Sequence, residues 1–229
     1  MPPYTRIAAF DLETTGVDPL TARVVTATVQ ATDYGVSDQP HDTVELLANP
    51  GCEIPAGAAA IHGVTTAHAV AHGRPHDEVV SEVVEALRFS WAHGYTVVAF
   101  NAAYDLTVLA SQCPGFTVEG PVIDPYVIDK TFSRRRGPRK LLNVAEFYGL
   151  DTSGGVAHTS AFDTVLASQL AVQVAERYDL PGPEGINAAQ VQWYHDMQSS
   201  LADYFARTGK VLDTPVNTQW PIQSGGDKS

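Results

Sequence analysis

Hydrophobic and polar positions in the first fifty residues follow the spacing of strands. The apolar run 7–10 predicts a short buried strand that ends at the turn Thr15-Gly16, and segments 24–31 and 43–47 predict two further strands. Asn49-Pro50-Gly51 is a turn sequence that closes the third strand. Because the connections between these segments are short, we expect the three strands to form an antiparallel meander.

The rest of the chain alternates between strand and helix patterns. Residues 96–100 form a continuous apolar run, which is typical of a strand buried on both faces, and 121–124 predict another short strand. Helical patterns occupy 77–87, 102–111, 141–148, 161–177 and 187–206. Three strands followed by alternating strands and helices predict an α/β layered domain with a mixed sheet.

Composition and breaker residues indicate how the chain is divided. A chain of 229 residues that is 44% hydrophobic and 17% charged suits one globular domain with an extension. Pro181-Gly182-Pro183 marks a linker. We therefore expect a main domain over 1–180, a C-terminal helical extension of open role over 181–222, and a disordered tail over 223–229.

The totals also limit where the protein works. No apolar run is long enough to cross a membrane, and the first residues lack the basic-then-apolar layout of a signal peptide. Cys52 and Cys113 have no metal-type spacing, so a reducing, cytoplasmic location is the natural expectation. The sequence predicts no membrane partner.

Charge is unevenly distributed. The formal net charge is −12, which argues against broad, nonspecific coating of duplex nucleic acid. One short stretch is nevertheless basic, with Lys130, Arg134, Arg135, Arg136, Arg139 and Lys140. This stretch predicts local capture of a few phosphates, and the alternative is a solvated, flexible loop.

Two acidic residues stand at the end of the first predicted strand. Side chains of a strand alternate between faces, so Asp11 and Glu13 point the same way and Leu12 points the other way. Two neighbouring carboxylates repel each other, and a divalent cation is a natural counterion. The alternative is that both carboxylates lie in solvent.

A second acidic position follows the next buried strand. Asp105 falls in the first turn of the helix predicted after 96–100, and the ends of such strands are where open α/β sheets bind ligands. The alternative is ordinary helix chemistry, in which Asn101 caps the helix and Asp105 complements the helix dipole.

A third piece combines His158 with Asp163. Positions five apart do not converge on one helix, so the two side chains meet only if His158 lies on the loop before the helix. Gly154-Gly155 makes such a loop plausible. The alternative is a capping box, with Ser160 as the N-cap residue and Asp163 in the place of the usual glutamate.

Taken together, these pieces predict a metal centre. Four carboxylates and no cysteine suit Mg²⁺ or Mn²⁺, and four carboxylates can hold two such ions about 4 Å apart, the separation used for phosphoryl displacement. A neutral His158 could take the proton of the attacking water, because histidine titrates near neutral pH. The four acidic residues are Asp11, Glu13, Asp105 and Asp163.

In this order, the motifs Phe10-Asp11-Leu12-Glu13-Thr14-Thr15-Gly16, Asn101-x-x-x-Asp105 and His158-x-x-x-x-Asp163 resemble the DEDDh 3′–5′ exonucleases. That family includes the epsilon proofreading subunit of bacterial replicases, RNase T and oligoribonuclease. The resemblance covers about residues 5 to 176. It implies an RNase H-like fold, with a five-stranded mixed sheet flanked by helices.

The resemblance also implies roles. The four carboxylates would be the metal ligands and His158 the general base, so that all five would be catalytic. Thr14 and Thr15 would approach the terminal nucleotide. The segment Ile61-His62-Gly63-Val64-Thr65 resembles one that lies near the substrate in proofreading-like members, so His62 joins Asn101 among the expected substrate-binding residues.

The expected function is metal-dependent 3′–5′ hydrolysis of single-stranded DNA, which releases nucleoside 5′-monophosphates in proofreading or repair. A 3′–5′ exoribonuclease is the alternative. A haloacid dehalogenase-type phosphatase is remote, because Glu13 replaces the usual aspartate and no lysine ends an apolar strand. An inactive binding subunit is opposed by the complete motif set.

The last predicted helix offers one further partner. Gln198-x-x-Leu201-x-x-Tyr204-Phe205 resembles a sliding-clamp peptide, which would allow contact with a clamp or replicase. The same residues fit the apolar stripe of a helix that packs on its own domain, and we favour that interpretation.

Overall fold

The computed structural model describes residues 4–153, 159–212 and 214–225. Its first three strands are β1 (Arg6–Thr14), β2 (Val24–Asp33) and β3 (Asp42–Asn49). Each pairs antiparallel with the next, which confirms the expected meander. β2 and β3 are longer than the apolar pattern predicts, because their polar ends still pair in the ladder, as Asp33 does with Arg6.

Parallel strands complete the sheet. β5 (Thr96–Val98) pairs with β1, β6 (Val122–Ile123) pairs with β5, and the two-residue β4 (Arg74–Pro75) pairs with β3. The resulting order is β4-β3-β2-β1-β5-β6. The expected mixed α/β sheet is confirmed, with the short edge strand β4 as an addition to the five strands that the sequence predicts.

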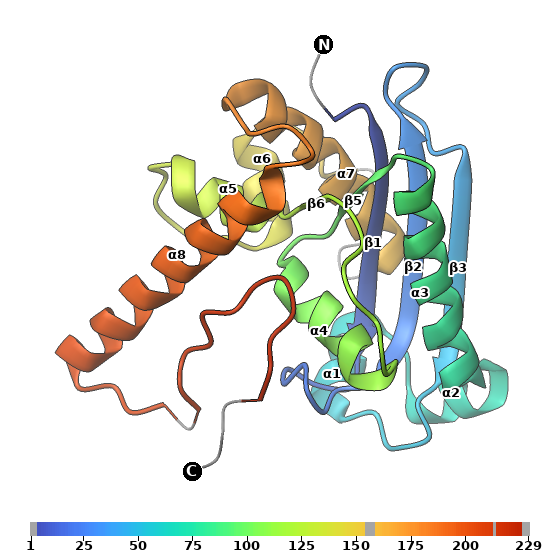
Figure 1. Cartoon of the computed structure of the whole chain (residues 1–229). Coiled ribbons are helices and arrows are strands. Elements are labelled where there is room, and N and C mark those ends of the chain that lie inside the picture. The colour runs from blue at the N-terminus through green and yellow to red at the C-terminus, as the bar shows by residue number, and fades with distance from the viewer. Residues whose placement is uncertain (1–3, 154–158, 213, 226–229) are drawn as a thin grey trace.

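Helices cover both faces of the sheet (Figure 1). They are α1 (Ala56–His62), α2 (Thr66–His72), α3 (His76–Ala92), α4 (Ala102–Gln112), α5 (Pro125–Phe132), α6 (Leu141–Phe147), α7 (Ser160–Arg177) and α8 (Ile186–Thr208). α1 and α2 were not expected, because α1 buries no residue and α2 buries only Ala69, so neither shows an apolar stripe. None of the helices in the described ranges has the length and hydropathy that crossing a membrane requires.

The side chains of β1 point alternately into two hydrophobic cores, one on each face of the sheet. Ala8 and Phe10 belong to the core that includes residues of α3 and α4, whereas Ile7 and Ala9 belong to the core formed with α7. Because odd-numbered residues of β1 share a face, Asp11 continues the face that is covered by α7. The pleat of this one strand therefore decides on which side of the sheet the acidic residues lie.

The C-terminal part of the chain leaves the body and returns to it. α8 extends away from the sheet, and the last described segment folds back toward α4 (Figure 1). Trp220 is 5% exposed and joins the core with α3 and α4. Gln223, which we placed in the tail, donates its backbone N–H to Thr107 Oγ1 and its side-chain amide to Tyr194 Oη, each at 2.8 Å.

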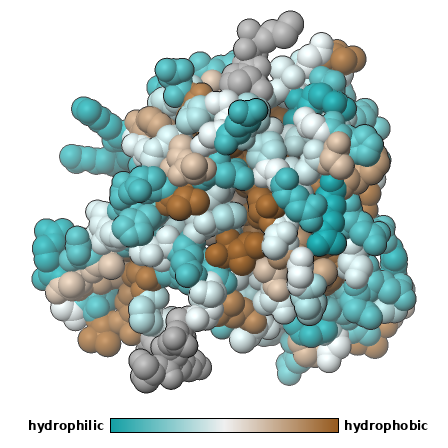
Figure 2. All heavy atoms as spheres, in the orientation of Figure 1, coloured by the Kyte–Doolittle hydropathy of each residue, from teal (hydrophilic) through white to brown (hydrophobic). Residues whose placement is uncertain are grey.

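Only the first half of α8 is packed. Its buried residues are Ile186, Gln190 and Tyr194, whereas Leu201 and Tyr204 are 41% and 52% exposed. Figure 2 shows hydrophobic residues at this distal end of α8. The single packed stripe that we favoured for this helix therefore holds for its first half alone.

Candidate active site

Three carboxylates from two elements converge on the α7 side of β1. One carboxylate oxygen each of Asp11, Glu13 and Asp163 lies within 4.8 Å of the other two. Asp11 and Glu13 come from alternate positions of β1, and Asp163 comes from the first turn of α7. Hard oxygen donors at this spacing suit a divalent cation such as Mg²⁺ or Mn²⁺.

A hydroxyl pair anchors α7 beside these residues. Thr28 of β2 is the cross-strand partner of Asp11, and its Oγ1 is hydrogen-bonded to Ser160 Oγ at 2.8 Å. Ser160 is the first residue of α7, so Asp163 follows one turn later on the same side. The alternative in which Ser160 caps the helix is wrong, because Ser160 already lies inside the helix and its hydroxyl binds Thr28.

Asp105, the fourth predicted ligand, lies near Asp11 but is not among the carboxylates whose oxygens lie within 4.8 Å of one another. It lies in the first turn of α4 and is 5% exposed. Burial raises the pKa of this carboxyl well above its usual range, and the backbone amides of Asp105 itself and of Leu12, which lies between the two acidic residues of β1, only partly oppose the rise. The alternative in which Asn101 caps α4 is wrong, because the Asn101 side chain makes no capping hydrogen bond.

Burial and mutual repulsion keep protons on these groups. Desolvation, followed by the charges of Asp105, Glu13 and Asp163, raises the pKa of Asp11 well above its usual range. Desolvation and the charge of Asp163 raise the pKa of Glu13 to about 7. A metal-free cluster of this kind therefore disfavours full ionisation, and a bound cation would reverse the effect.

Three of the four expected substrate-binding residues lie around the end of β1, and the fourth, Asn101, lies at the start of α4. Thr14 Oγ1 donates to the carbonyl of Gly16 at 2.9 Å, and Thr15 Oγ1 accepts the backbone N–H of Arg23 at 3.0 Å. The ring of His62 lies near the backbone of Thr14, and burial lowers its pKa. Asn101 is exposed at the start of α4, in the left-handed conformation with φ 67°.

Tyr104 is a residue of this site that the sequence interpretation missed. Its hydroxyl is hydrogen-bonded to Thr14 Oγ1 and donates to the carbonyl of Gly16, so it ties α4 to the turn after β1. Its position next to Asp105 was the available signal. The motif Asn101-x-x-x-Asp105 leaves this position unspecified. His158, the expected general base, lies outside the described residues, as does Gly154-Gly155.

The comparisons identify the family. The family model described as "Exonuclease" (RNase_T) matches residues 8–170, which include β1, α4 and the start of α7. The chain belongs to this exonuclease family. A DNA polymerase III subunit epsilon-like protein from Rhodobacter capsulatus is 25% identical over 162 residues. Those residues make up 70% of this chain and 22% of the relative, so the chain spans less than a quarter of the relative's length.

Solved exonuclease structures share the fold. An Escherichia coli ExoI–ssDNA complex in a zinc-bound form superposes with a TM-score of 0.60 at 16% identity, covering 77% of the present chain and 41% of that chain. Exonuclease X in complex with 5′-overhanging duplex DNA gives 0.59 at 16% identity, covering 80% and 99%. A 3′-exonuclease recognising a histone mRNA stem-loop gives 0.58 at 16% identity, covering 76% and 64%.

The basic stretch contains two kinds of cation. Arg135 and Arg139 turn inward to the fully buried carboxylate of Asp129, and their own side chains are 8% and 15% exposed. Arg134 and Arg136 are exposed. Only the exposed residues remain available for phosphates, so the stretch is smaller as a binding surface than its sequence indicates.

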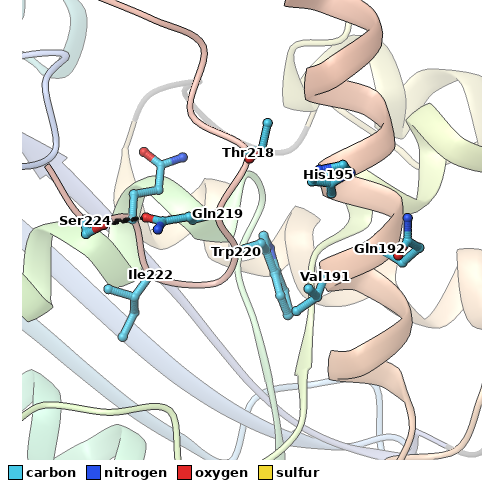
Figure 3. A pocket seen from close by; sticks show the side chains of 9 residues that line it. Val191, Gln192, His195, Thr218, Gln219, Trp220, Ile222 and Ser224 are labelled. Carbon is cyan, nitrogen blue, oxygen red and sulfur yellow. Dashed lines mark hydrogen bonds between the residues drawn. The ribbon is translucent and has the colours of Figure 1, made fainter. Parts of the chain in front are cut away.

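A cavity of about 590 Å³ lies apart from the carboxylates, between α8 and the returning C-terminal segment. In Figure 3, Val191 and His195 project from α8 toward Trp220 and Gln219 of that segment. Gln219 Oε1 accepts hydrogen bonds from the backbone and hydroxyl of Ser224. None of the acidic residues of the candidate site lines this cavity.

Proposed function

We propose that this protein is a metal-dependent 3′–5′ exonuclease that shortens single-stranded DNA and releases nucleoside 5′-monophosphates. Membership of the exonuclease family supports the reaction class. The observation that carries the proposal is the convergence of Asp11, Glu13 and Asp163 within 4.8 Å. A phosphatase of the haloacid dehalogenase type has no such support from the fold, because the solved neighbours are exonucleases.

The donor set fits the expected metal. Three clustered carboxylates, with Asp105 beside them, offer hard oxygen ligands. The pKa values of Asp11 and Glu13 are raised in the metal-free protein, so a nearby cation would stabilise their ionised forms. We propose that these four residues hold two Mg²⁺ or Mn²⁺ ions. Bound divalent cations of this kind lower the pKa of a coordinated water and offset charge on the phosphodiester.

The protein's own groups orient the reacting end. Tyr104 and Thr14 are hydrogen-bonded to each other beside the carboxylates, and Thr14 lies next to His62. We propose that the terminal nucleotide contacts this surface. We propose His158 as the group that accepts the proton of the attacking water. That role rests on the motif His158-x-x-x-x-Asp163 alone.

The nature of the nucleic acid follows from the neighbours by analogy. Two of them hold DNA, one single-stranded and one duplex with a 5′ overhang, and a third recognises an RNA stem-loop. The relative that resembles a DNA polymerase III subunit favours DNA and a proofreading or repair role. We therefore propose single-stranded DNA as the substrate, with RNA as the second candidate. Contact of α8 with a clamp or replicase is not part of the proposal.

The test is digestion of matched 3′-labelled and 5′-labelled oligonucleotides of DNA and RNA, single- and double-stranded, with Mg²⁺ or with EDTA. We expect loss of the 3′ label as 5′-monophosphates, faster for single-stranded DNA, and no reaction in EDTA. Asp11→Asn should be inactive, and Asp196→Asn, an exposed acidic residue of α8, should be as active as the wild type. Cleavage that starts at the 5′ end or persists in EDTA would contradict the proposal.

A further inference from the structure

A buried carboxylate outside the acidic cluster joins β6 to α4. Asp124 follows β6 directly and is 0% exposed. Its Oδ1 accepts the backbone N–H of Asn101 at 2.9 Å and that of Tyr126 at 3.0 Å, and its Oδ2 accepts the backbone N–H of Ala102 at 2.9 Å. One side chain therefore supplies acceptors to the first residues of both α4 and α5.

The start of α4 depends on this carboxylate. The first N–H groups of a helix have no partner within the helix, and the side chain of Asn101 at the N-cap position makes no capping bond. Asn101 also has φ 67°, a conformation that residues with a side chain rarely adopt. Asp124 therefore caps α4 from a neighbouring strand and stabilises the unusual backbone at Asn101.

The C-terminal extension fixes Asp124 in turn. Gln190 of α8 is fully buried, and its Oε1 accepts the backbone N–H of Asp124 at 2.8 Å while its Nε2 donates to the carbonyl of Val122 at 2.6 Å. One turn earlier, Asn187 Oδ1 accepts the N–H of Val122 at 2.8 Å and Nδ2 donates to the carbonyl of Gly120 at 2.9 Å. Two side-chain amides thus pair with the edge of β6 in the place of another strand.

The contacts of Asp124 with α4 affect Asp105, a candidate metal ligand. Asp105 lies three residues after Ala102, in the same first turn of α4, so the direction of its side chain is set by how that turn begins. Burial raises the pKa of Asp124 to about 6, although its backbone N–H donors oppose the rise. At neutral pH the group is therefore mainly a carboxylate, and a buried carboxylate depends on such donors for its stability.

We propose that Asp124 is a positioning residue that orients Asp105 for metal binding, and that Gln190 holds Asp124 in place. The extension after Pro183 then helps to set the geometry of the site and does not act as a separate domain. This inference rests on the proposed function, because it assigns Asp105 to the metal. It goes beyond that function by giving α8 and β6 a role in ligand geometry.

The test compares metal affinity with fold stability in the full chain. Mn²⁺ titration by calorimetry, well below the melting temperature, should give a dissociation constant that is about 10- to 100-fold weaker for Asp124→Asn, the usual effect of losing a group that orients a metal ligand. Gln190→Ala should weaken Mn²⁺ binding in the same direction. Asn187→Ala is the matched control, because it removes two bonds from the same helix to the same strand edge without touching Asp124.

These measurements distinguish a residue that positions Asp105 for metal binding from one that only stabilises the fold. We expect Gln190→Ala and Asn187→Ala to lower the melting temperature by similar amounts, while Asn187→Ala keeps the wild-type Mn²⁺ affinity within about twofold. If all variants lose stability but bind Mn²⁺ like the wild type, the inference is wrong. If Asp124→Asn does not fold, the comparison of Gln190→Ala with Asn187→Ala decides the same question.

A different set of results would overturn the proposed function. A wild-type protein that binds Mn²⁺ but does not degrade nucleic acid would overturn the proposed function, and the pattern of Mn²⁺ affinities among the variants would still decide the role of Asp124. A wild-type protein that does not bind Mn²⁺ would overturn both.

Discussion

Asp129 and Arg139 form an ion pair inside the protein, with the aspartate side chain fully buried and the arginine side chain 15% exposed. Arg135 reaches the same carboxylate at 3.2 Å, and the hydroxyl of Tyr148 donates to its other oxygen at 3.2 Å. Arg139 also donates to the backbone carbonyl of Arg135 at 3.0 Å. This network holds the segment between α5 and α6 together, so Arg135 and Arg139 serve the fold.

Removal of Arg139 should therefore destabilise the protein. Arg139→Ala leaves the buried carboxylate of Asp129 with fewer partners, and breaking a buried pair in this way costs about 3 to 5 kcal/mol. Because Arg135 remains, we expect the lower end of that range. Urea denaturation would measure it, with the exposed Arg134→Ala as the control that leaves stability unchanged. Equal stability of the two variants would show that the buried pair contributes nothing.

The exposed cations of the same segment should act on substrate instead. The double variant Arg134→Ala/Arg136→Ala should weaken binding of single-stranded DNA and reduce the slope of log K against log salt by about 1.4, because each neutralised phosphate of a single strand accounts for about 0.7 of that slope. Turnover at saturating substrate should stay nearly intact. Fluorescence anisotropy over a salt series would test this, and an unchanged slope would show that these arginines do not contact phosphates.

Removal of Asp11 should separate metal binding from folding. Asp11→Ala relieves the repulsion that raises the pKa of this carboxyl, so the metal-free variant should melt at the same temperature as the wild type or higher. It should lose nuclease activity and the gain in melting temperature that Mn²⁺ gives the wild type. Thermal melts with EDTA and with Mn²⁺ would measure both. An active Asp11→Ala would place the site elsewhere.

The sequence was informative where one element decides the geometry. The period of a strand alone puts Asp11 and Glu13 on one face of β1, and the structure brings both to Asp163. The helices α3 and α7 could be predicted from their apolar stripes. The sequence pattern does not predict α5, although Asp124 caps it and Pro125 occupies its first position.

Other features depend on contacts between distant segments. Nothing in the local sequence shows that Gln190 reaches Asp124 across 66 positions, or that Thr28 anchors α7 at Ser160. Arg135 looks like its exposed neighbour Arg134 in the sequence, and only the packing of Asp129 distinguishes them. Such pairings follow from tertiary arrangement, which hydropathy and spacing do not encode.

His158 gives a prediction that rests on the sequence motif. If it accepts the proton of the attacking water, His158→Ala should lower turnover by about 10² to 10⁴, the usual effect of removing a positioned base. Mn²⁺ affinity should change little, and the acid limb of the pH–rate profile should weaken. His68→Ala, an exposed histidine of α2, is the control. Loss of Mn²⁺ binding in His158→Ala would make His158 a ligand rather than a base.

Glu13 predicts a stability that falls as pH rises in the metal-free protein and does not fall when metal is bound. Burial and the charge of Asp163 raise its pKa from 4.5 to about 7 in the metal-free protein. Between these values the folded state holds a proton that the unfolded state has released, so this group makes stability fall as pH rises from about 4.5 to 7. A bound cation favours the carboxylate and lowers the folded-state pKa, so above about pH 5 Glu13 is then ionised in both the folded and the unfolded state and its contribution no longer falls with pH.

The slope that Glu13 contributes must be isolated from other groups. Burial lowers the pKa of His62 and His76, and a lowered histidine pKa makes stability rise with pH near 6, which opposes the effect of Glu13. The measurement is therefore the difference in unfolding free energy between the wild type and Glu13→Gln, followed from pH 5 to 8 in EDTA and in saturating Mn²⁺. In EDTA the wild type should lose stability relative to Glu13→Gln as pH rises, and in Mn²⁺ this loss should disappear. A loss of the same size under both conditions would mean that Glu13 does not bind the metal.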